Sequence, residues 1–344
     1  MKRVVLIFFF AFSISQDYPV LGDDNSLDFA TWNLEWFPKN NQTTLNYVSE
    51  IIEQLDLDII AIQELTDTDM FDDMLDDLPD YTGYYESLWF AGLAYIYKTD
   101  VIEVNDIYEI YTTSPYWSAF PRSPMVMDID FMGQNYLFIN NHFKCCGDGN
   151  LNLNNDSDEE MRRLNASNLL KEYIDNNLSN KNVIVLGDLN DDIAESSANN
   201  VFQTILDDTD NYRFVDMDIA SGSSSHWSYP TWPSHLDHIL ITNELFDELD
   251  NSDVQTIKLD QYLNGGWNEY DNNISDHRPV FMKLADNSLP GDVNSDDLIN
   301  ILDVVLIVQI IIGNQAPLDS ADFNQDGQIN ILDVVQLVGI VVNN

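Results

Sequence analysis

The sequence predicts an α/β protein with buried sheets, followed by a second, small helical domain built around two calcium-binding loops. Three observations lead to this prediction. Short apolar strands alternate with helix-like segments through residues 27–285, the composition changes after Ala285, and the end of the chain repeats itself with a period of 30 residues. The 344 residues, 44% of them hydrophobic, suffice for one large and one small domain.

The charge of the chain limits what it can act on. Its 14 Lys and Arg residues stand against 59 Asp and Glu residues, which gives a net charge of −45 at pH 7. Such a charge favours solubility and repels polyanions at long range. A reaction on a nucleic acid or phosphate ester would therefore need local cations or a bound metal.

Residues 1–15 predict a secretory signal peptide of the bacterial type. Lys2 and Arg3 give its charged start, residues 4–14 its apolar stretch, and residues 13–15 the small side chains for cleavage. Eleven apolar residues are too few to span a bilayer, and no later segment is apolar for long enough. We expect a secreted, extracellular protein without stable membrane insertion; a membrane anchor is the alternative.

The two cysteines, Cys145 and Cys146, are neighbours. Because the chain has no other cysteine, oxidation within it would have to form a strained vicinal disulfide. Two reduced, packed thiols are the alternative, and the sequence does not decide between them.

The strand and helix alternation can be followed along the large domain. "SLDFATWNLEWF" alternates in its first half and predicts a strand that ends near Asn33. Thr43 or Thr44 can cap the next helix, and "DIIAIQEL" returns as a buried strand. A helix from about Asp158 to Leu178 leads into the strand of "NVIVLGDLND". The apolar face of the first helix comprises Leu45, Val48, Ile51, Ile52 and Leu55.

Residues 291–344, after a linker at 286–290, contain two loops with calcium-binding spacing. Oxygen-bearing side chains stand at loop positions one, three, five, nine and twelve, and position seven would offer its backbone carbonyl. A hard cation needs six to eight oxygens, so each loop predicts one bound Ca²⁺. The ligand positions of the first loop are Asp292, Asn294, Asp296, Leu298, Asn300 and Asp303. Those of the second are Asp322, Asn324, Asp326, Gln328, Asn330 and Asp333.

This repeated loop and helix pair resembles a type I dockerin. The resemblance implies a calcium-stabilised module that docks onto a cohesin-type scaffold protein. Two features depart from the family pattern. In the first loop, Asp297 stands at the turn position where calcium loops prefer glycine; in the second loop, Gly327 satisfies this preference. Apolar residues at 301–302 and 331–332 also stand where many dockerins carry small hydroxyl residues for the cohesin contact. A purely structural calcium module is the alternative.

Polar side chains end several strands of the large domain. Because strand ends of an α/β sandwich converge on one crevice, these groups are candidates for a functional site. Any one of them alone would be an ordinary turn former or structural histidine. The series runs Asn33 and Glu35, Gln63 and Glu64, His142, Asp188 and Asn190, Asp237 and His238, and Asp276 and His277.

The segments "WNLEWF", "QEL", "GDLND", "LDHIL" and "SDHRPV" together resemble the endonuclease/exonuclease/phosphatase superfamily, which includes DNase I. The resemblance covers roughly residues 27–285. It implies a four-layer α/β sandwich with two central mixed sheets and a Mg²⁺- or Mn²⁺-dependent hydrolysis of phosphoesters. In that reaction a metal neutralises the phosphate and an activated water attacks it.

The resemblance also implies a role for each strand-end residue. Glu64 would bind the metal. Asn33 and Asp276 would either bind the metal as well or contact one of its ligands. Asp188 would orient or deprotonate the water, and Asn190 would donate to phosphate oxygens. The two histidines, His142 and His277, would stabilise phosphoryl charge and assist proton transfer, with Asp237 holding one tautomer of His277.

Two basic residues are candidates for phosphate contact. Arg122 in "FPRSPM" matches a phosphate-contacting position of the family. Lys144 follows His142 by two residues and shares its face if the strand continues; an ordinary exposed lysine is the alternative. The aromatic residues of "SSSHWSYPTWPSHLDH" either pack as a loop over the site or stack on a base or sugar.

Three functions fit these residues. The first is a secreted nuclease with extracellular DNA or RNA as substrate. The second is a secreted phosphoesterase for lipid or inositol phosphates, and the third is a silent binding module that kept the fold. The complete set of strand-end residues argues against the third. The stretch "NNHFKCCGDG" resembles secreted bacterial members described as nucleases, and no segment suited to membrane insertion is evident, so the sequence favours the nuclease.

Overall fold

The computed structural model of the chain describes residues 17–23, 26–87, 89–285, 291–294, 298–315, 317–324 and 327–342. The predicted signal peptide, the linker at 286–290 and the loop residues Asp296 and Asp326 lie outside these ranges. Within them, no helix combines the length and the apolar character needed to cross a bilayer.

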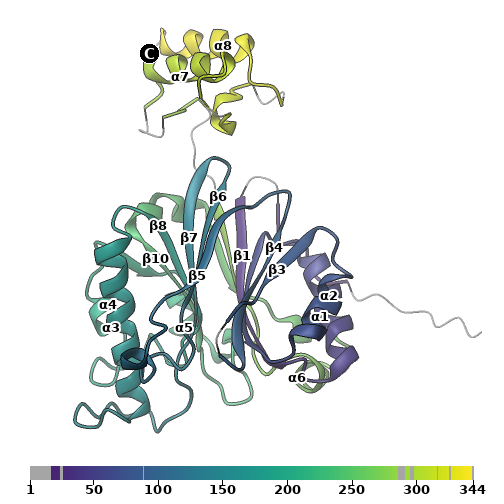
Figure 1. The fold of residues 1–344 in the computed structure, drawn as a ribbon, viewed down its shortest axis with the longest axis vertical. Coiled ribbons are helices and arrows are strands. Elements are labelled where there is room, and N and C mark those ends of the chain that lie inside the picture. Colours follow the sequence, from purple (N-terminus) through teal and green to yellow (C-terminus); the bar gives the residue numbers. More distant parts are fainter. Residues whose placement is uncertain are drawn as a thin grey trace, which may run out of the picture.

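Residues 26–285 form two six-stranded sheets that pack face to face between two layers of helices (Figure 1). The first sheet has the order β11 (Asp253–Thr256), β12 (Val280–Ala285), β1 (Ser26–Phe37), β2 (Ile59–Leu65), β4 (Gly92–Lys98) and β3 (Tyr81–Tyr84). The second has the order β5 (Glu103–Glu109), β6 (Met125–Phe131), β7 (Gln134–His142), β8 (Asn182–Asp188), β10 (Asp237–Thr242) and β9 (Tyr212–Phe214). Each sheet mixes parallel and antiparallel pairs, so the predicted four-layer sandwich is confirmed.

Helices cover the outer face of each sheet. The first sheet is covered by α1 (Asn41–Leu55), α2 (Thr68–Leu75) and α6 (Trp267–Asn273). The second is covered by α3 (Glu159–Asn177), α4 (Gln203–Leu206) and α5 (Met217–Ala220). Short 3₁₀ turns lie at Ser114–Tyr116, Ser224–His226, Asn243–Leu245, Asp247–Asn251 and Leu259–Tyr262.

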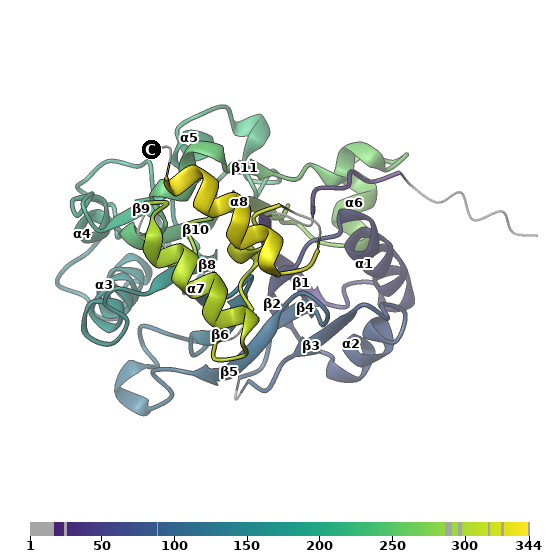
Figure 2. The same cartoon turned by 90° about the horizontal axis from the view of Figure 1, so that it is seen from above.

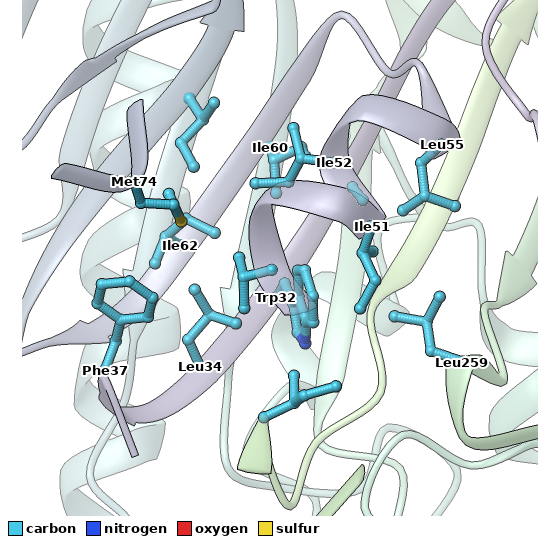
Figure 3. Close-up of a cluster of buried hydrophobic side chains, with 14 of the residues drawn as sticks. Trp32, Leu34, Phe37, Ile51, Ile52, Leu55, Ile60, Ile62, Met74 and Leu259 are labelled. Atoms are coloured by element: carbon cyan, nitrogen blue, oxygen red, sulfur yellow. The ribbon is translucent and has the colours of Figure 1, made fainter. Parts of the chain in front are cut away.

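Three apolar layers hold the sandwich together, one between the sheets and one under each helical layer. The predicted apolar face of α1 is buried against β1 and β2, where Trp32 is a large central side chain (Figure 3). The cap of this helix differs from the prediction. Asn40 occupies the N-cap position, and Thr44 instead accepts a hydrogen bond from the Asn40 amide.

Strand pairing places the strand ends that carry the candidate site residues at the same end of the sandwich. Parallel pairs β1–β2 and β7–β8 finish at the same end of the sandwich, and the register places His142 and Asp237 on either side of Asp188. Gly187 permits this close pairing. Its φ is +143°, and a side-chain carbon there would lie 2.0 Å from the carbonyl oxygen of Asn141.

The C-terminal module contains α7 (Ile301–Ile311) and α8 (Ile331–Val341), which lie side by side (Figure 2). Val304, Ile307 and Leu337 belong to a small apolar core of its own. Each helix begins with a capping box, formed by Asn300 with Asp303 and, in the second repeat, by Asn330 with Asp333. The predicted small helical domain is confirmed.

Candidate active site

Six strand ends bring their polar side chains together at one end of the sandwich. Asn33 is in β1, Glu64 in β2 and His142 in β7; Asp188 ends β8 and Asp237 begins β10. The segment that precedes β12 adds two further groups, Asp276 and His277. These residues lie together at one end of the sandwich, in agreement with their predicted convergence.

Asn33 joins the two sheets at this end. Its Nδ2 donates to Asp188 Oδ2 at 2.9 Å and to Glu64 Oε1 at 3.3 Å. Its Oδ1 accepts from the amide of Glu35 at 2.8 Å. Asn33 therefore orients two carboxylates, and its amide oxygen, which accepts one hydrogen bond, keeps a second lone pair.

Two of the site residues have left-handed backbones. Glu64 has a φ of +64° and Asn190 a φ of +56°, a conformation uncommon for residues other than glycine. Local hydrogen bonds hold both segments, since the Trp36 amide donates to Glu64 Oε2 at 3.1 Å and the Asn190 amide donates to Asp188 Oδ1 at 3.0 Å. Such backbone geometry is concentrated at functional sites, where the surrounding structure maintains it.

His277 is held by a buried carboxylate. Its Nδ1 lies 2.7 Å from Asp237 Oδ2, so its Nε2 faces the site, 3.9 Å from Asp188 Oδ2 and 3.8 Å from Asp276 Oδ1. Burial alone would lower the pKa of His277, but the charges of Asp237 and Asp188 outweigh burial and raise this pKa to about 10. The histidine is thus oriented as a cationic donor.

The second histidine is electrostatically different. His142 Nε2 lies 3.5 Å from Asp188 Oδ2 and 3.7 Å from Glu64 Oε1. Its pKa is well below the ordinary value because the ring is fully buried and because Arg122 and His277 place positive charge nearby. Its buried Nδ1 has no hydrogen-bond partner among the described residues. One neutral and one cationic imidazole therefore flank the same carboxylate.

That carboxylate, Asp188, is 1% exposed. Burial raises its pKa to about 7, a shift opposed by the charge of His277 and by the Asn33 hydrogen bond and increased by Asp237 and Glu64. A carboxyl that titrates near neutrality is suited to proton transfer with water.

The carboxylates also fit a small hard cation. Glu64 keeps 14% of its side chain exposed and shares the Asn33 and His142 contacts with Asp188, while Asp276 Oδ1 lies 3.8 Å from His277 Nε2. Mg²⁺ prefers one or two carboxylates together with waters and substrate phosphates. The oxygen donors at this edge suit Mg²⁺ or Mn²⁺. Asp188, Asp237 and His277 form a second set that could hold an ion, since their ligand atoms lie within 4.8 Å of one another.

The two predicted phosphate contacts differ in placement. Arg122 donates from Nε to the carbonyl of Ala91 at 3.2 Å, and its charge acts on His142. Strand β7 ends at His142, so the alternation expected to align Lys144 with it stops too early. Lys144 instead donates to the carbonyl of Cys145 at 2.8 Å.

Sequence reasoning missed a buried arginine below the site. Arg163, on α3, is 2% exposed and donates from Nε to Asp191 Oδ2 at 2.8 Å. Its Nη1 donates to the carbonyls of Lys144 and Cys146 at 2.6 and 2.8 Å, and it pairs with Glu160. The Arg163 guanidinium thereby connects the loops that follow His142 and Asp188. No sequence motif predicts this role.

A second buried network lies behind β10. His238 Nδ1 is 2.6 Å from Asp216 Oδ2 and its Nε2 is 2.8 Å from the carbonyl of Asp191, while His235 Nε2 is 3.0 Å from the same Asp216 oxygen. Both nitrogens of His238 face acceptors, so this ring is protonated on both. These three residues could geometrically hold a metal, but a doubly protonated ring has no lone pair for one. The cluster is an ion pair that fixes the segment after Asp188.

A polar contact between the sheets supports the site from beneath. Asn140 Oδ1 accepts from Gln63 Nε2 at 2.8 Å, and its Nδ2 donates to the carbonyls of Ile62 and Ala94 at 3.0 Å each. All its polar atoms are engaged although it is fully buried. This side chain fixes β7 against β2 and β4 where the site begins.

In both calcium loops, the aspartate at position twelve accepts hydrogen bonds from amides of the loop backbone. Asp303 Oδ1 accepts from the amides of residues 293 and 294 at 2.9 and 3.2 Å. In the second repeat, Asp333 Oδ1 accepts from the Asn324 amide at 3.1 Å. Asn300 and Asn330 each accept from a helix amide as N-caps. The hard oxygens present fit Ca²⁺, with Asp303 and Asp333 fully buried.

Comparisons with known proteins identify a family for each part of the chain. The sequence matches the profile described as "Endonuclease/Exonuclease/phosphatase family" over residues 30–277 and that described as "Dockerin type I domain" over residues 290–339. No significant match to a curated protein was found.

Solved structures are similar at low sequence identity. TDP2 from D. rerio complexed with a single-strand DNA product is 13% identical, with a TM-score of 0.56 over 76% of this chain and 99% of that one. An endonuclease/exonuclease/phosphatase family protein from Bacteroides thetaiotaomicron is 17% identical, with a TM-score of 0.53 over 76% and 98%. The human Nocturnin catalytic domain is 14% identical, with a TM-score of 0.53 over 75% and 93%. These likenesses concern the fold.

Proposed function

The chain belongs to the endonuclease/exonuclease/phosphatase family of phosphoester hydrolases, and from this premise we propose that it is a secreted, metal-dependent nuclease acting on extracellular DNA or RNA. The observation that carries the proposal is the arrangement around Asp188, a buried carboxyl with a neutral histidine on one side and a cationic histidine on the other. Such an arrangement separates the base from the acid of a hydrolysis.

Glu64 and Asp276 would hold the Mg²⁺ or Mn²⁺, and Asn33 would fix the position of Glu64. When bound, the ion would neutralise charge on the phosphate and polarise its phosphorus–oxygen bonds. The remaining chemistry belongs to side chains of this chain.

Asp188 would accept a proton from the attacking water, because its buried carboxyl titrates near neutrality and Asn33 and the Asn190 amide hold its two oxygens. The Asn190 side chain would donate to a phosphate oxygen. His277, held by Asp237, would donate from Nε2 to the phosphoryl group or the departing oxygen. His142 and Arg122 would stabilise the negative charge that develops there.

For the C-terminal module we infer two bound Ca²⁺ ions and attachment to a cohesin-type scaffold, which agrees with the dockerin match. The exposed starts of α7 and α8 support an apolar contact. Ile301 and Leu302 are exposed in the first repeat, and Ile331 and Leu332 occupy the same positions in the second. A scaffold-attached enzyme is an extracellular one, consistent with the predicted signal peptide.

The test is an activity panel with purified protein and Mg²⁺. We expect cleavage of DNA or RNA, inhibition by EDTA, and loss of activity in Asp188→Ala with an unchanged circular dichroism spectrum. Asp192→Ala, in the same loop, is the matched control and should retain activity. Turnover of sphingomyelin or inositol phosphates without cleavage of either nucleic acid would replace the nuclease with the alternative phosphoesterase, and an active Asp188→Ala would refute the site.

A further inference from the structure

Two aromatic pairs lie beside the site, Trp36 with Phe90 and Trp89 with Trp117. Because Trp89 and Phe90 are neighbours in the chain, we call the four residues together the aromatic strip. Ring centroids of Trp36 and Phe90 are 6.0 Å apart, and those of Trp89 and Trp117 are 5.4 Å apart in an edge-to-face arrangement. Phe90 is 74% exposed, Trp36 52% and Trp117 46%. Large apolar rings gathered at the surface in this way mark a binding surface more often than a packing accident.

Hydrogen bonds connect the aromatic strip to two parts of the candidate site, Glu64 and the Arg122 segment. The amide of Trp36 donates to Glu64 Oε2 at 3.1 Å, so one end of the strip adjoins the proposed metal ligand. Trp89 Nε1 donates to the buried Ser123 Oγ at 2.9 Å, next to Arg122. Arg122 in turn donates to the carbonyl of Ala91, the residue after Phe90. The strip therefore runs from the metal side of the crevice to its phosphate-contacting side.

The backbone holds these rings outward at a cost. Trp36 has a φ of +54° and Ala91 a φ of +52°, both in the left-handed region. Non-glycine residues there cost on the order of 1 kcal/mol or more each. The hydrogen bond from the Trp36 amide to Glu64 and that from Arg122 to the Ala91 carbonyl hold this backbone, while the rings of Trp36 and Phe90 stay exposed and available to a ligand.

Charge narrows the class of ligand. Two basic side chains near the site are paired with carboxylates, Lys39 with Glu35 and Asp271, and Arg278 with Asp260. Arg122 and Lys144 donate to backbone carbonyls instead, which leaves few cations for phosphate contact. With a net charge of −45, the protein is a poor match for duplex DNA, whose binding depends on many phosphate contacts. Unpaired bases present flat faces that stack on aromatic side chains, and this stacking, which base pairing in a duplex prevents, adds affinity beyond the phosphate contacts.

We propose that the aromatic strip binds unpaired nucleobases next to the scissile phosphate, which makes single-stranded nucleic acid the substrate of this site. The inference rests on the proposed nuclease function and adds the substrate class to it. Affinity then comes mainly from ring stacking, and Arg122 positions the phosphate between the strip and His142.

The experiment compares three substrates of one length, namely an unstructured oligonucleotide, its duplex and an abasic strand with the same phosphates but no bases. Phe90→Ala and Trp117→Ala are the test variants, chosen because their backbones do not contact Glu64. Phe90→Tyr should keep the stacking surface. Tyr262→Ala is the matched control, an exposed aromatic that pairs with Tyr18.

For the wild type we expect the lowest KM on the unstructured strand. The KM for the duplex and for the abasic strand should be higher by roughly tenfold or more. Each alanine variant should raise the KM for the unstructured strand by roughly tenfold, leave kcat nearly unchanged, and have no effect on the abasic strand. Phe90→Tyr and Tyr262→Ala should behave as wild type. This pattern depends on bases, so a merely structural role of the strip would not produce it.

Two outcomes would overturn the proposal while leaving the nuclease function intact. In one, cleavage continues but the alanine variants match the wild type; in the other, the abasic strand or the duplex is cut as well as the unstructured one. A third outcome, soluble oligosaccharides quenching tryptophan fluorescence where oligonucleotides do not, would assign the strip to sugar binding. Failure of the nuclease proposal itself would appear differently, as no cleavage of any oligonucleotide by the wild type.

Discussion

Asp216→Asn is expected to destabilise the protein strongly although the residue lies outside the catalytic crevice. The Asp216 carboxylate accepts from His235, from His238 and from the Ile239 amide at 2.6–3.0 Å, all of them buried. An asparagine would place an NH₂ group against ring N–H donors and leave His238 without its counter-ion. Breaking a buried ion pair in this way costs about 3–5 kcal/mol, which for a domain of this size corresponds to a Tm lower by roughly 10 °C.

The loss should depend on pH in a predictable direction. Burial would raise the pKa of Asp216, but His238 and His235 hold it below its ordinary value; burial would lower the pKa of His238, but Asp216 raises it. The Asp216 contribution is present above its unfolded pKa of about 4 and is lost as pH falls through the folded value. The His238 contribution is full below its unfolded pKa of about 6.5 and is lost as pH rises through the folded value.

The difference in Tm between wild type and Asp216→Asn should therefore be largest between about pH 4 and 6.5 and smaller at pH 9. Calorimetric melting at pH 5.5 and pH 9 measures it, with Asp218→Asn, an exposed neighbour, as the control expected to shift Tm by less than about 1 °C. Equal Tm values for wild type and Asp216→Asn would refute the ion pair. If Zn²⁺ raised the Tm of the wild type and a chelator lowered it, whereas neither changed the Tm of Asp216→Asn, the cluster would be a metal site instead.

Three further predictions concern the site and the module. Asp237→Asn should lower kcat by about 10²–10⁴ with little change in KM, because His277 loses the carboxylate that orients it; steady-state kinetics measure this, and an unchanged kcat would contradict it. Arg163→Met should cost about 3–5 kcal/mol in chemical denaturation by leaving Asp191 and Glu160 unpaired, whereas a loss below 1 kcal/mol would show that the loops hold themselves. EGTA in excess Mg²⁺ should reduce the helical signal of the C-terminal module without changing kcat, because α7 and α8 have their own core; a parallel loss of activity would contradict this separation.

The fold was largely predictable because its signals are local or repeated. The spacing of the apolar residues in α1 predicts its buried face, and the two calcium loops repeat nearly the same sequence at a fixed interval. Even the strand-end residues could be predicted as a group, since parallel strands direct their ends to one edge. These inferences need no knowledge of which distant side chains touch.

The supporting networks were not predictable for the opposite reason. Asp191 and Asp192 look alike in the sequence, yet Asp191 binds Arg163 through its side chain and His238 through its carbonyl. Likewise, His235 had no motif to distinguish it from a loop histidine, and it is fully buried against Asp216. Such roles arise from contacts between residues far apart in the chain, which no periodicity records.

The ends of the large domain lie together, and far from its crevice. Ser26 at the start of β1 pairs with Ala285 at the end of β12, whereas Asp276 and His277 precede the other end of β12, about 20 Å away at ~3.3 Å per residue. A tether attached after Ala285 therefore pulls on the face opposite to the catalytic groups. An enzyme immobilised through such a tether would present its crevice outward, so crowding on a scaffold would leave access for long, flexible substrates.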